Sequence, residues 1–284
     1  GEAYILCWRL LTDGTISLVS TITADTSSNA LPFDEDYLQQ YNTAQYGDVM
    51  FICHPLFAPR MLTRTSLTSF ELSVYSFDTD YSGENTKQPY SVFHPSNVTL
   101  TCNSTSAGLT NVTATTSTHY FKTDGSHVGV TLRHNGCELL ITNVSSTLAV
   151  NVTIIKTLKQ RLSVLNPLRT RDGSNKVEIT HLSHGLSQGA SITISDAVAV
   201  GGLNASHING TRSINEIIDD NTYIVLASTN ANTSEDGGGF VSITSGAATR
   251  NWDEQSFSAV RGYPAAVTFH ENRLCFGGTI AEPD

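Results

Sequence analysis

The chain has 284 residues, enough for one large domain or several small ones, and its hydrophobic fraction of 39% excludes an intrinsically disordered protein. Charged residues make up only 15%, and Ser, Thr and Asn are abundant, a composition typical of strands and turns. The net charge of −10 excludes a global basic field for nucleic acid, and no apolar run is long enough for a membrane-spanning helix.

The first 80 residues alternate short apolar runs with turn residues. The runs at residues 4–8 and 16–19 flank Asp13-Gly14, which predicts a β-hairpin. Residues 33–45 carry acidic residues followed by Tyr and Leu at helical spacing, which predicts a short helix. Further strands are predicted at residues 48–54, 61–62 and 70–74, so this part reads as an antiparallel meander.

Two further all-β segments follow along the chain. Residues 96–166 contain several apolar runs of strand length and an Asn135-Gly136 pair, the strongest short-range hairpin signal in the sequence. Asn166-Pro167 marks a boundary before a third set of strands, and residues 247–284 return to the style of the first part. We therefore expect a β body formed by residues 1–80 and 247–284, interrupted by two small β-barrel or β-sandwich modules at 81–167 and 168–246.

The cysteines predict reduced thiols rather than a disulfide framework. Their number, five, is odd, no CxxC pair occurs, and Cys53 and Cys275 lie inside apolar runs, where we expect them to be small core residues. The first residues show no basic segment followed by an apolar stretch, so we expect no signal peptide. The N-x-S/T triplets are then explained by the abundance of Asn, Ser and Thr rather than by glycosylation.

The sequence shows no motif of a known catalytic type. GxSxG, HExxH, P-loop and GxGxxG patterns are all absent. His181 and His184, with His207, do not form a metal site if the first two lie on a strand, since a spacing of three places them on opposite faces. The acidic run Asp34-Glu35-Asp36 lacks an EF-hand pattern. Carboxylates suited to a glycosidase pair are better explained as turn residues, namely Glu216, Asp219 and Asp220. We expect no enzyme, no cofactor and no metal.

Isolated arginines stand out in this acidic chain. Arg60 and Arg64 flank a strand that follows a loop with two prolines, and Arg261 and Arg273 lie near the end of the sequence. They fit two roles equally: salt bridges and carbonyl contacts within the chain, or pairing with carboxylates of a neighbouring subunit, for which the arginine fork is suited.

Two blocks of this sequence resemble a bacteriophage family. Residues 44–55 (AQYGDVMFICHP), 58–64 (APRMLTR) and 70–72 (FEL), together with residues 261–279 (RGYPAAVTFHENRLCFGGT), are similar to the signature of tail tubular protein B, the nozzle of short-tailed phages. Phe70 stands where that pattern often has Trp. The middle segments are similar to a small barrel insert and to a β module common in phage tail proteins.

The resemblance implies a fold, an assembly and a location. It implies a propeller-like β body, of which these residues would be a part, and a homohexameric ring below the portal and its adaptor. It also implies contact with tail fibres, passage of double-stranded DNA through the lumen, and a place in the virion after assembly in the host cytoplasm. Two other functions stay open: a receptor- or glycan-binding adhesin or fibre protein, which predicts exposed aromatic side chains on module loops, and a polysaccharide depolymerase, which the absence of β-helix repeats disfavours.

Overall fold

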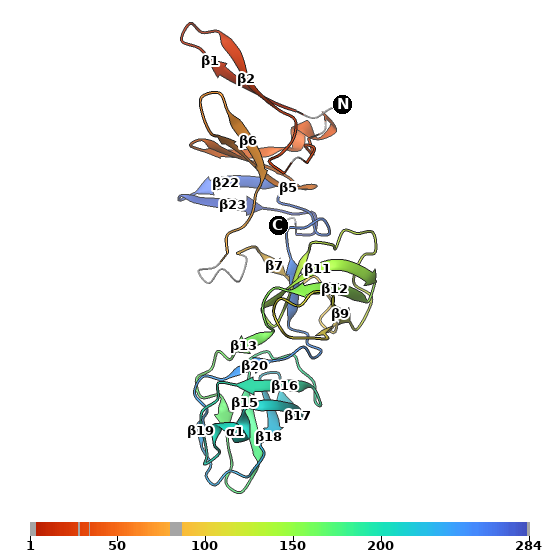
Figure 1. The fold of residues 1–284 in the computed structure, drawn as a ribbon, viewed down its shortest axis with the longest axis vertical. Helices are drawn as coiled ribbons and strands as arrows, with labels where there is room; N and C mark the ends of the chain where they lie inside the picture. Colours follow the sequence, from red (N-terminus) through yellow and green to blue (C-terminus); the bar gives the residue numbers. More distant parts are fainter. Residues whose placement is uncertain (1–3, 28, 34, 80–86, 283–284) are drawn as a thin grey trace. The chain divides into compact units, whose positions relative to one another are not determined.

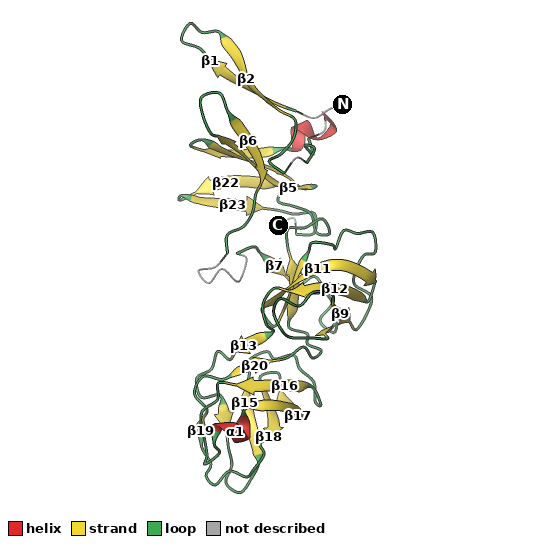
Figure 2. Ribbon diagram, in the orientation of Figure 1, coloured by secondary structure: helices red, strands yellow, loops and turns green. Residues whose placement is uncertain are grey.

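The computed structural model describes residues 4–27, 29–33, 35–79 and 87–282. It is 46% strand and 3% helix, which confirms the predicted all-β class (Figure 2). The chain divides into two compact units, Gly1–Pro89 with Ser256–Asp284, and Tyr90–Gln255. Among the described residues, no helix is long and apolar enough to cross a membrane.

The first unit contains a four-stranded antiparallel sheet and two hairpins (Figure 1). The strands of the sheet follow one another in chain order, as expected for a meander. The bounds are β1 (Ile5–Leu10) and β2 (Ile16–Ile22) for the first hairpin, β3 (Asn42–Tyr46), β4 (Val49–His54), β5 (Phe57–Arg64) and β6 (Phe70–Val74) for the sheet, and β22 (Ala266–His270) and β23 (Arg273–Gly277) for the second hairpin.

The short helix predicted over residues 33–45 is confirmed only in part. The structure has a short 3₁₀ helix, η1 (Glu35–Gln40), and the chain then enters β3. Two observations explain the difference. The apolar spacing reflects packing of the Tyr37 and Tyr41 rings on His54, at centroid distances of 5.2 and 5.0 Å. Cross-strand pairing of β3 with β4 then extends the backbone, an example of tertiary contacts overriding a local pattern.

The second unit contains two larger antiparallel sheets. The first has seven strands, in the spatial order β7 (Tyr90–Ser91), β21 (Trp252–Gln255), β10 (Thr131–His134), β11 (Cys137–Ser146), β12 (Ala149–Ile154), β9 (Val112–Thr116) and β8 (Leu100–Cys102). The second has eight, in the order β13 (Lys159–Arg161), β20 (Ser242–Thr244), β16 (Ser191–Ser195), β17 (Gly210–Asp219), β18 (Thr222–Leu226), β15 (Lys176–Thr180), β14 (Leu168–Arg169) and β19 (Asp236–Gly237), accompanied by the short helix α1 (Ala205–Ile208).

Local sequence signals and sheet membership agree only in part. Asn135-Gly136 forms the predicted hairpin turn between β10 and β11, and both residues have positive φ angles, 51° and 81°. We expected the chain to return to the first part at residue 247, but the second unit continues to Gln255. The reason is that β21 pairs with β10 inside the seven-stranded sheet. Trp252 anchors that strand: it is buried, its ring stacks on His94 at 4.0 Å, and its Nε1–H donates to the Val98 carbonyl.

All five cysteines are free, but their environments differ. Cys7, Cys53, Cys102 and Cys137 are buried, and Cys275 is exposed. The expectation that Cys275 is a core residue is wrong, because β23 alternates and turns Leu274 and Phe276 inward.

Thiol reactivity should follow this difference in burial. Burial raises the pKa of the Cys53 thiol to about 12, so its reactive thiolate is scarce at neutral pH. With a chromogenic disulfide reagent at pH 8, we expect Cys275 to react quickly and the four buried thiols to react only after denaturation. A Cys275→Ser variant should lose the fast phase alone. A fast phase that survives this substitution would contradict the assigned exposures.

Candidate functional site

The segments that carry the nozzle-like signature meet in the first unit. One block forms β3 to β6, and the other forms the β22–β23 hairpin, which packs against β3 and β4. The Val267 N–H donates to Asn42 Oδ1 at 2.8 Å, a bond between residues 225 positions apart. The Phe269 ring lies 5.6 Å from Tyr46 and 5.9 Å from Phe51, centroid to centroid. The two blocks thus complete one packed body.

Two of the four candidate arginines make defined contacts within the β3–β6 sheet. The Arg64 guanidinium forms an ion pair with the Asp48 carboxylate, and both side chains are about half exposed. Arg60 is half-buried and donates from Nη1 to the Ala58 carbonyl at 2.7 Å. Burial lowers the pKa of Arg60, and the negative charge of Asp25 counteracts that effect.

The other two arginines occupy different surroundings. The Arg261 backbone N–H donates to Ser258 Oγ at 3.2 Å, and its carbonyl accepts from the Ala281 N–H at 3.0 Å, so the residue holds a loop together. Arg273 is exposed at the start of β23, opposite His270. The four arginines therefore do not form a single site: Arg64 lines a groove, and Arg60 lines a separate, smaller pocket beside His54.

That groove lies at one end of the β3–β6 sheet and has a volume of about 220 Å³. It combines an apolar floor with a charged rim. The floor residues Met50 and Leu62 are cross-strand partners, and the rim carries the Arg64–Asp48 pair. The full lining is Gln45, Gly47, Asp48, Met50, Leu62, Arg64 and Phe70. We refer to these residues as the sheet-end groove; an apolar floor with a polar rim is a common design of binding surfaces.

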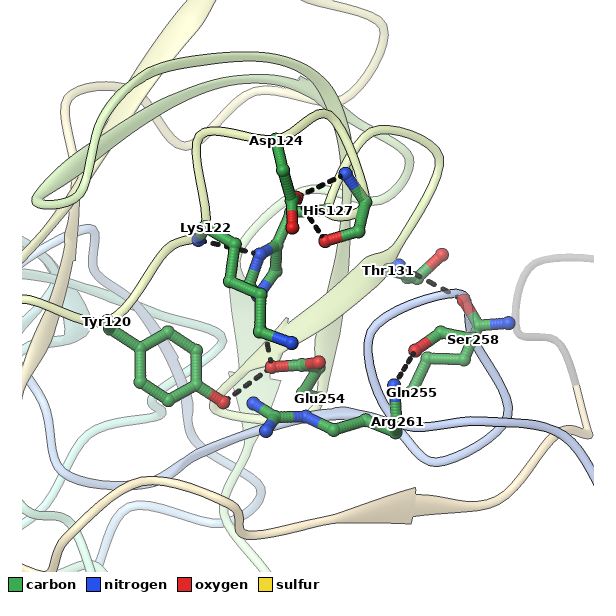
Figure 3. Close-up of polar contacts among 10 residues, drawn as sticks. Tyr120, Lys122, Asp124, His127, Thr131, Glu254, Gln255, Ser258 and Arg261 are labelled. Atoms are coloured by element: carbon green, nitrogen blue, oxygen red, sulfur yellow. Dashed lines mark hydrogen bonds and ion pairs between the residues drawn. The ribbon is translucent and has the colours of Figure 1, made fainter. Parts of the chain in front are cut away.

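A polar cluster in the second unit was not anticipated from the sequence (Figure 3). Glu254 is fully buried and accepts a hydrogen bond from the Tyr120 hydroxyl at 2.5 Å. The Nε2 atom of His127 lies 3.8 Å from the same carboxylate oxygen, and its Nδ1 accepts the Lys122 backbone N–H at 3.0 Å. A neutral His127 therefore carries its proton on Nε2, facing Glu254. The hydrogen bond between Tyr120 and Glu254 is shielded from solvent, and it ties the loop at residues 120–127 to β21.

The rings of His181 and His184 lie 6.0 Å apart, centroid to centroid, because the two residues do not share a strand, as the opposite-face argument required. β15 ends at Thr180, and Ser183 adopts a positive φ of 51°, which turns the chain. Both rings pack on Tyr223, at centroid distances of 5.9 and 5.1 Å. His207 lies apart and contacts Ser228 Oγ. Within the described residues, no group of three His, Cys, Asp or Glu side chains could hold a metal ion.

The candidate carboxylates are engaged in local structure. Glu216 forms an ion pair with Lys176 at 3.4 Å, and Asp219 accepts the Asn221 N–H at 2.8 Å. Asp220 accepts the His184 backbone N–H through its carbonyl. Asp219 ends β17 and Asp220 lies in the turn after it, as the sequence indicated, whereas Glu216 lies inside the strand. Asp34, part of the acidic run, lies outside the described residues.

Comparisons with known proteins identify no family for this chain. No protein-family model matches the chain, and no curated protein matches it. Among solved structures, a phage phi92 endosialidase is similar with a TM-score of 0.26 and 13% identity, over 75% of this chain. The chain spans 28% of the length of that endosialidase. A TM-score this low is below the level at which two chains share a fold, so the likeness carries no information about a site here.

Proposed function

We propose that this chain is a structural β protein of a bacteriophage tail, which acts by assembling with other chains rather than by catalysis. The finer proposal is a nozzle-like subunit of a ring through which DNA leaves the virion. The observation that supports it is the packing of the two signature blocks, bridged by Val267 and Asn42, into one body. A coincidental pair of motifs would have no reason to share a hydrophobic contact such as that of Phe269 with Tyr46 and Phe51.

The charge of the chain suits this role. A net charge of −10 repels the phosphate backbone, so DNA could slide through a conduit built of such subunits without sticking to its wall. The proposed partners are further copies of the chain, a head-to-tail adaptor and tail fibres.

One observation favours receptor or glycan binding as a second candidate function. Phe240, beside the eight-stranded sheet, is 54% exposed, and the Arg161 guanidinium covers one face of its ring at 3.8 Å. An exposed aromatic ring held by a cation is the type of platform on which a sugar ring can stack. The adhesin or fibre reading predicts such a ring on a module.

Electron microscopy of the purified chain and of immunolabelled phage particles tests the proposal. Closed rings, with label on the tail axis below the head, are expected for the nozzle-like subunit. Label on fibres, together with binding to a glycan array that a Phe240→Ala variant loses, would instead establish the second candidate. Absence of label from the tail would contradict both.

We also expect Arg64→Glu to impair assembly while leaving the fold intact. The Arg64–Asp48 pair is exposed, so its loss should change the free energy of unfolding by less than about 1 kcal/mol. Repulsion at the rim of the sheet-end groove should nevertheless weaken contact with a neighbour. Arg169→Glu is a matched control, because Arg169 forms a similarly exposed pair with Asp236. Unchanged assembly and infectivity of Arg64→Glu would refute an interface role for this residue.

A further inference from the structure

A polar cleft lies within the second unit, where loops that belong to its two large sheets meet. Its volume is about 350 Å³, larger than that of the sheet-end groove. The lining comes from the segment before β8, from the chain that follows β15 and β17, and from the two residues before β21. We refer to it as the loop cleft, formed by Ser96, Ser183, Gly185, Asp220, Arg250 and Asn251.

The backbone on one side of the loop cleft is held by a close approach of two segments. Gly185 has a φ of +57°, and a Cβ atom there would lie 3.0 Å from both the Arg250 nitrogen and Thr249 Oγ1. Thr249 is fully buried. Its Oγ1 donates to the His184 carbonyl at 3.3 Å and accepts the Asn251 N–H at 3.0 Å. The chain after β15 is therefore fixed against the segment before β21.

Backbone hydrogen bonds also hold the turn between β17 and β18 in place. The Ser183 N–H donates to Asn221 Oδ1 at 2.9 Å, and the His184 N–H donates to the Asp220 carbonyl at 3.1 Å. These bonds use main-chain atoms of the lining residues and leave their side chains uncommitted. A backbone that positions polar side chains in advance lowers the entropic cost of binding a ligand.

The polar side chains of the loop cleft have unused hydrogen-bonding capacity. Among the described residues, neither the Asp220 carboxylate nor the Arg250 guanidinium has a hydrogen-bonding or ionic partner, although both line the same cleft. The same is true, within the part of the chain that the structure describes, of the Ser96 and Ser183 hydroxyls and the Asn251 side-chain amide. Donors and acceptors from several loops thus converge on one space.

Arg250 differs in this respect from the other arginines of the second unit. Each of the others has a partner for its guanidinium, which is a carboxylate, an aromatic ring or a backbone carbonyl. The pairs are Arg133 with Asp253, Arg169 with Asp236, Arg171 with Glu178, Arg161 with the Phe240 ring, and Arg212 with the His207 carbonyl. Two opposite charges that line one cleft without pairing can both be satisfied by a ligand between them.

The lining residues define the chemistry of such a ligand. An anion would be repelled by Asp220, a cation would be repelled by Arg250, and an apolar molecule would meet no apolar side chain among the lining residues. A hydroxyl group both donates and accepts, so neighbouring hydroxyls can donate to a carboxylate and accept from a guanidinium. The volume is at the lower end of the range for ligand sites, roughly 300–1,000 Å³, and suits a short saccharide.

We propose that the loop cleft binds a short neutral saccharide, with Asp220 accepting hydrogen bonds from its ring hydroxyls and Arg250 donating to them. This inference goes beyond the proposed structural role and does not depend on it. It also shares no residue with the Phe240 ring. Because the cleft offers no aromatic side chain for a sugar ring to stack on, binding rests on hydrogen bonds, and we expect a Kd of about 1 mM.

Saturation-transfer NMR and calorimetric titration of the full chain with lactose, maltose and cellobiose test the proposal. For a disaccharide that binds, Asp220→Ala and Arg250→Ala should each raise the Kd at least about tenfold, because hydrogen bonds to charged groups are the strong ones. Asp172→Ala and Arg169→Ala are matched controls, since both residues are exposed in the same unit and lie outside the cleft. Thermal denaturation of each variant establishes that the fold persists.

Several results would overturn the proposal. One is the absence of binding by any of these disaccharides up to about 20 mM, well above the expected Kd. A second is binding that Phe240→Ala abolishes while Asp220→Ala and Arg250→Ala retain it, which would place the sugar on the Phe240 ring. A third is binding of glycine with none of the disaccharides, which would assign the two charges to a zwitterion. Loss of sugar binding in the two cleft variants alone is the result that we expect.

Discussion

Gly201→Ala is expected to lower the free energy of unfolding of the second unit by about 3 kcal/mol or more, because it combines backbone strain with overpacking. Gly201 has a φ of +58°, in the left-handed region that favours glycine. A Cβ atom there would lie 2.0 Å from Thr170 Oγ1 and 2.9 Å from the Thr233 carbonyl oxygen. Thr170 cannot easily move away, because it is buried and its Oγ1 donates to that same carbonyl at 3.0 Å.

Gly189→Ala supplies the matched control for this substitution. Gly189 has a φ of +82°, but a Cβ atom there would meet nothing within 4 Å. Strain alone should then cost about 1 kcal/mol. Urea denaturation followed by circular dichroism measures both variants. Equal losses of stability would show that the close approach of Gly201 to Thr170 is absent.

The second large effect is a loss of stability at acidic pH that originates at His181. Burial, with the charge of the neighbouring His184, lowers the pKa of His181 to about 4 from its ordinary value of 6.5. Between these two values the unfolded chain binds a proton that the folded chain does not, so the free energy of unfolding falls as pH decreases. Above pH 6.5 His181 is neutral in the folded and the unfolded chain, so it does not lower the free energy of unfolding there. Protonation over this interval should remove about 3 kcal/mol.

A substitution separates this contribution from those of the carboxylates. His181 contacts the Tyr223 hydroxyl and Gln160 Oε1, each at 3.3 Å. His181→Gln retains hydrogen-bonding capacity and does not titrate, so it should flatten the decline in stability between pH 6.5 and 4. Urea denaturation at several pH values measures this slope. The control is His207→Gln, at a half-buried histidine whose ring contacts Ser228 Oγ, and it should leave the slope unchanged. An unchanged slope in His181→Gln would contradict the assigned pKa.

Strands, turns and fold class could be predicted from the sequence because their signals are local. Asn135-Gly136 determines a hairpin wherever it stands between two apolar runs, since both positions need positive φ angles. The run at residues 49–54 forms β4, and the alternation at residues 70–74 forms β6. Period and turn chemistry are properties of a few adjacent residues, so no knowledge of distant contacts is needed.

The candidate surfaces were only partly accessible to such an analysis. Arg64 could be singled out as a cation near a motif, but its partner Asp48 and the groove beside it depend on how β3 to β6 pair. Trp8, Leu10 and Ile16 predict a strand pair, and the same residues in a covered hairpin would be core. Only the structure shows that one face of this hairpin is covered and the other is open.

The sequence by itself determined an acidic, all-β chain with free thiols, in which two motif blocks lie at the ends and other strands lie between them. The tertiary structure decided which strands share a sheet, that Cys275 faces outward, that Glu254 is buried beside Tyr120, and that His181 meets His184. The physical reason is the same in each case. Sheet pairing and burial join residues far apart in the chain, and a strand's pattern shows that it has an inner face without showing what will cover it.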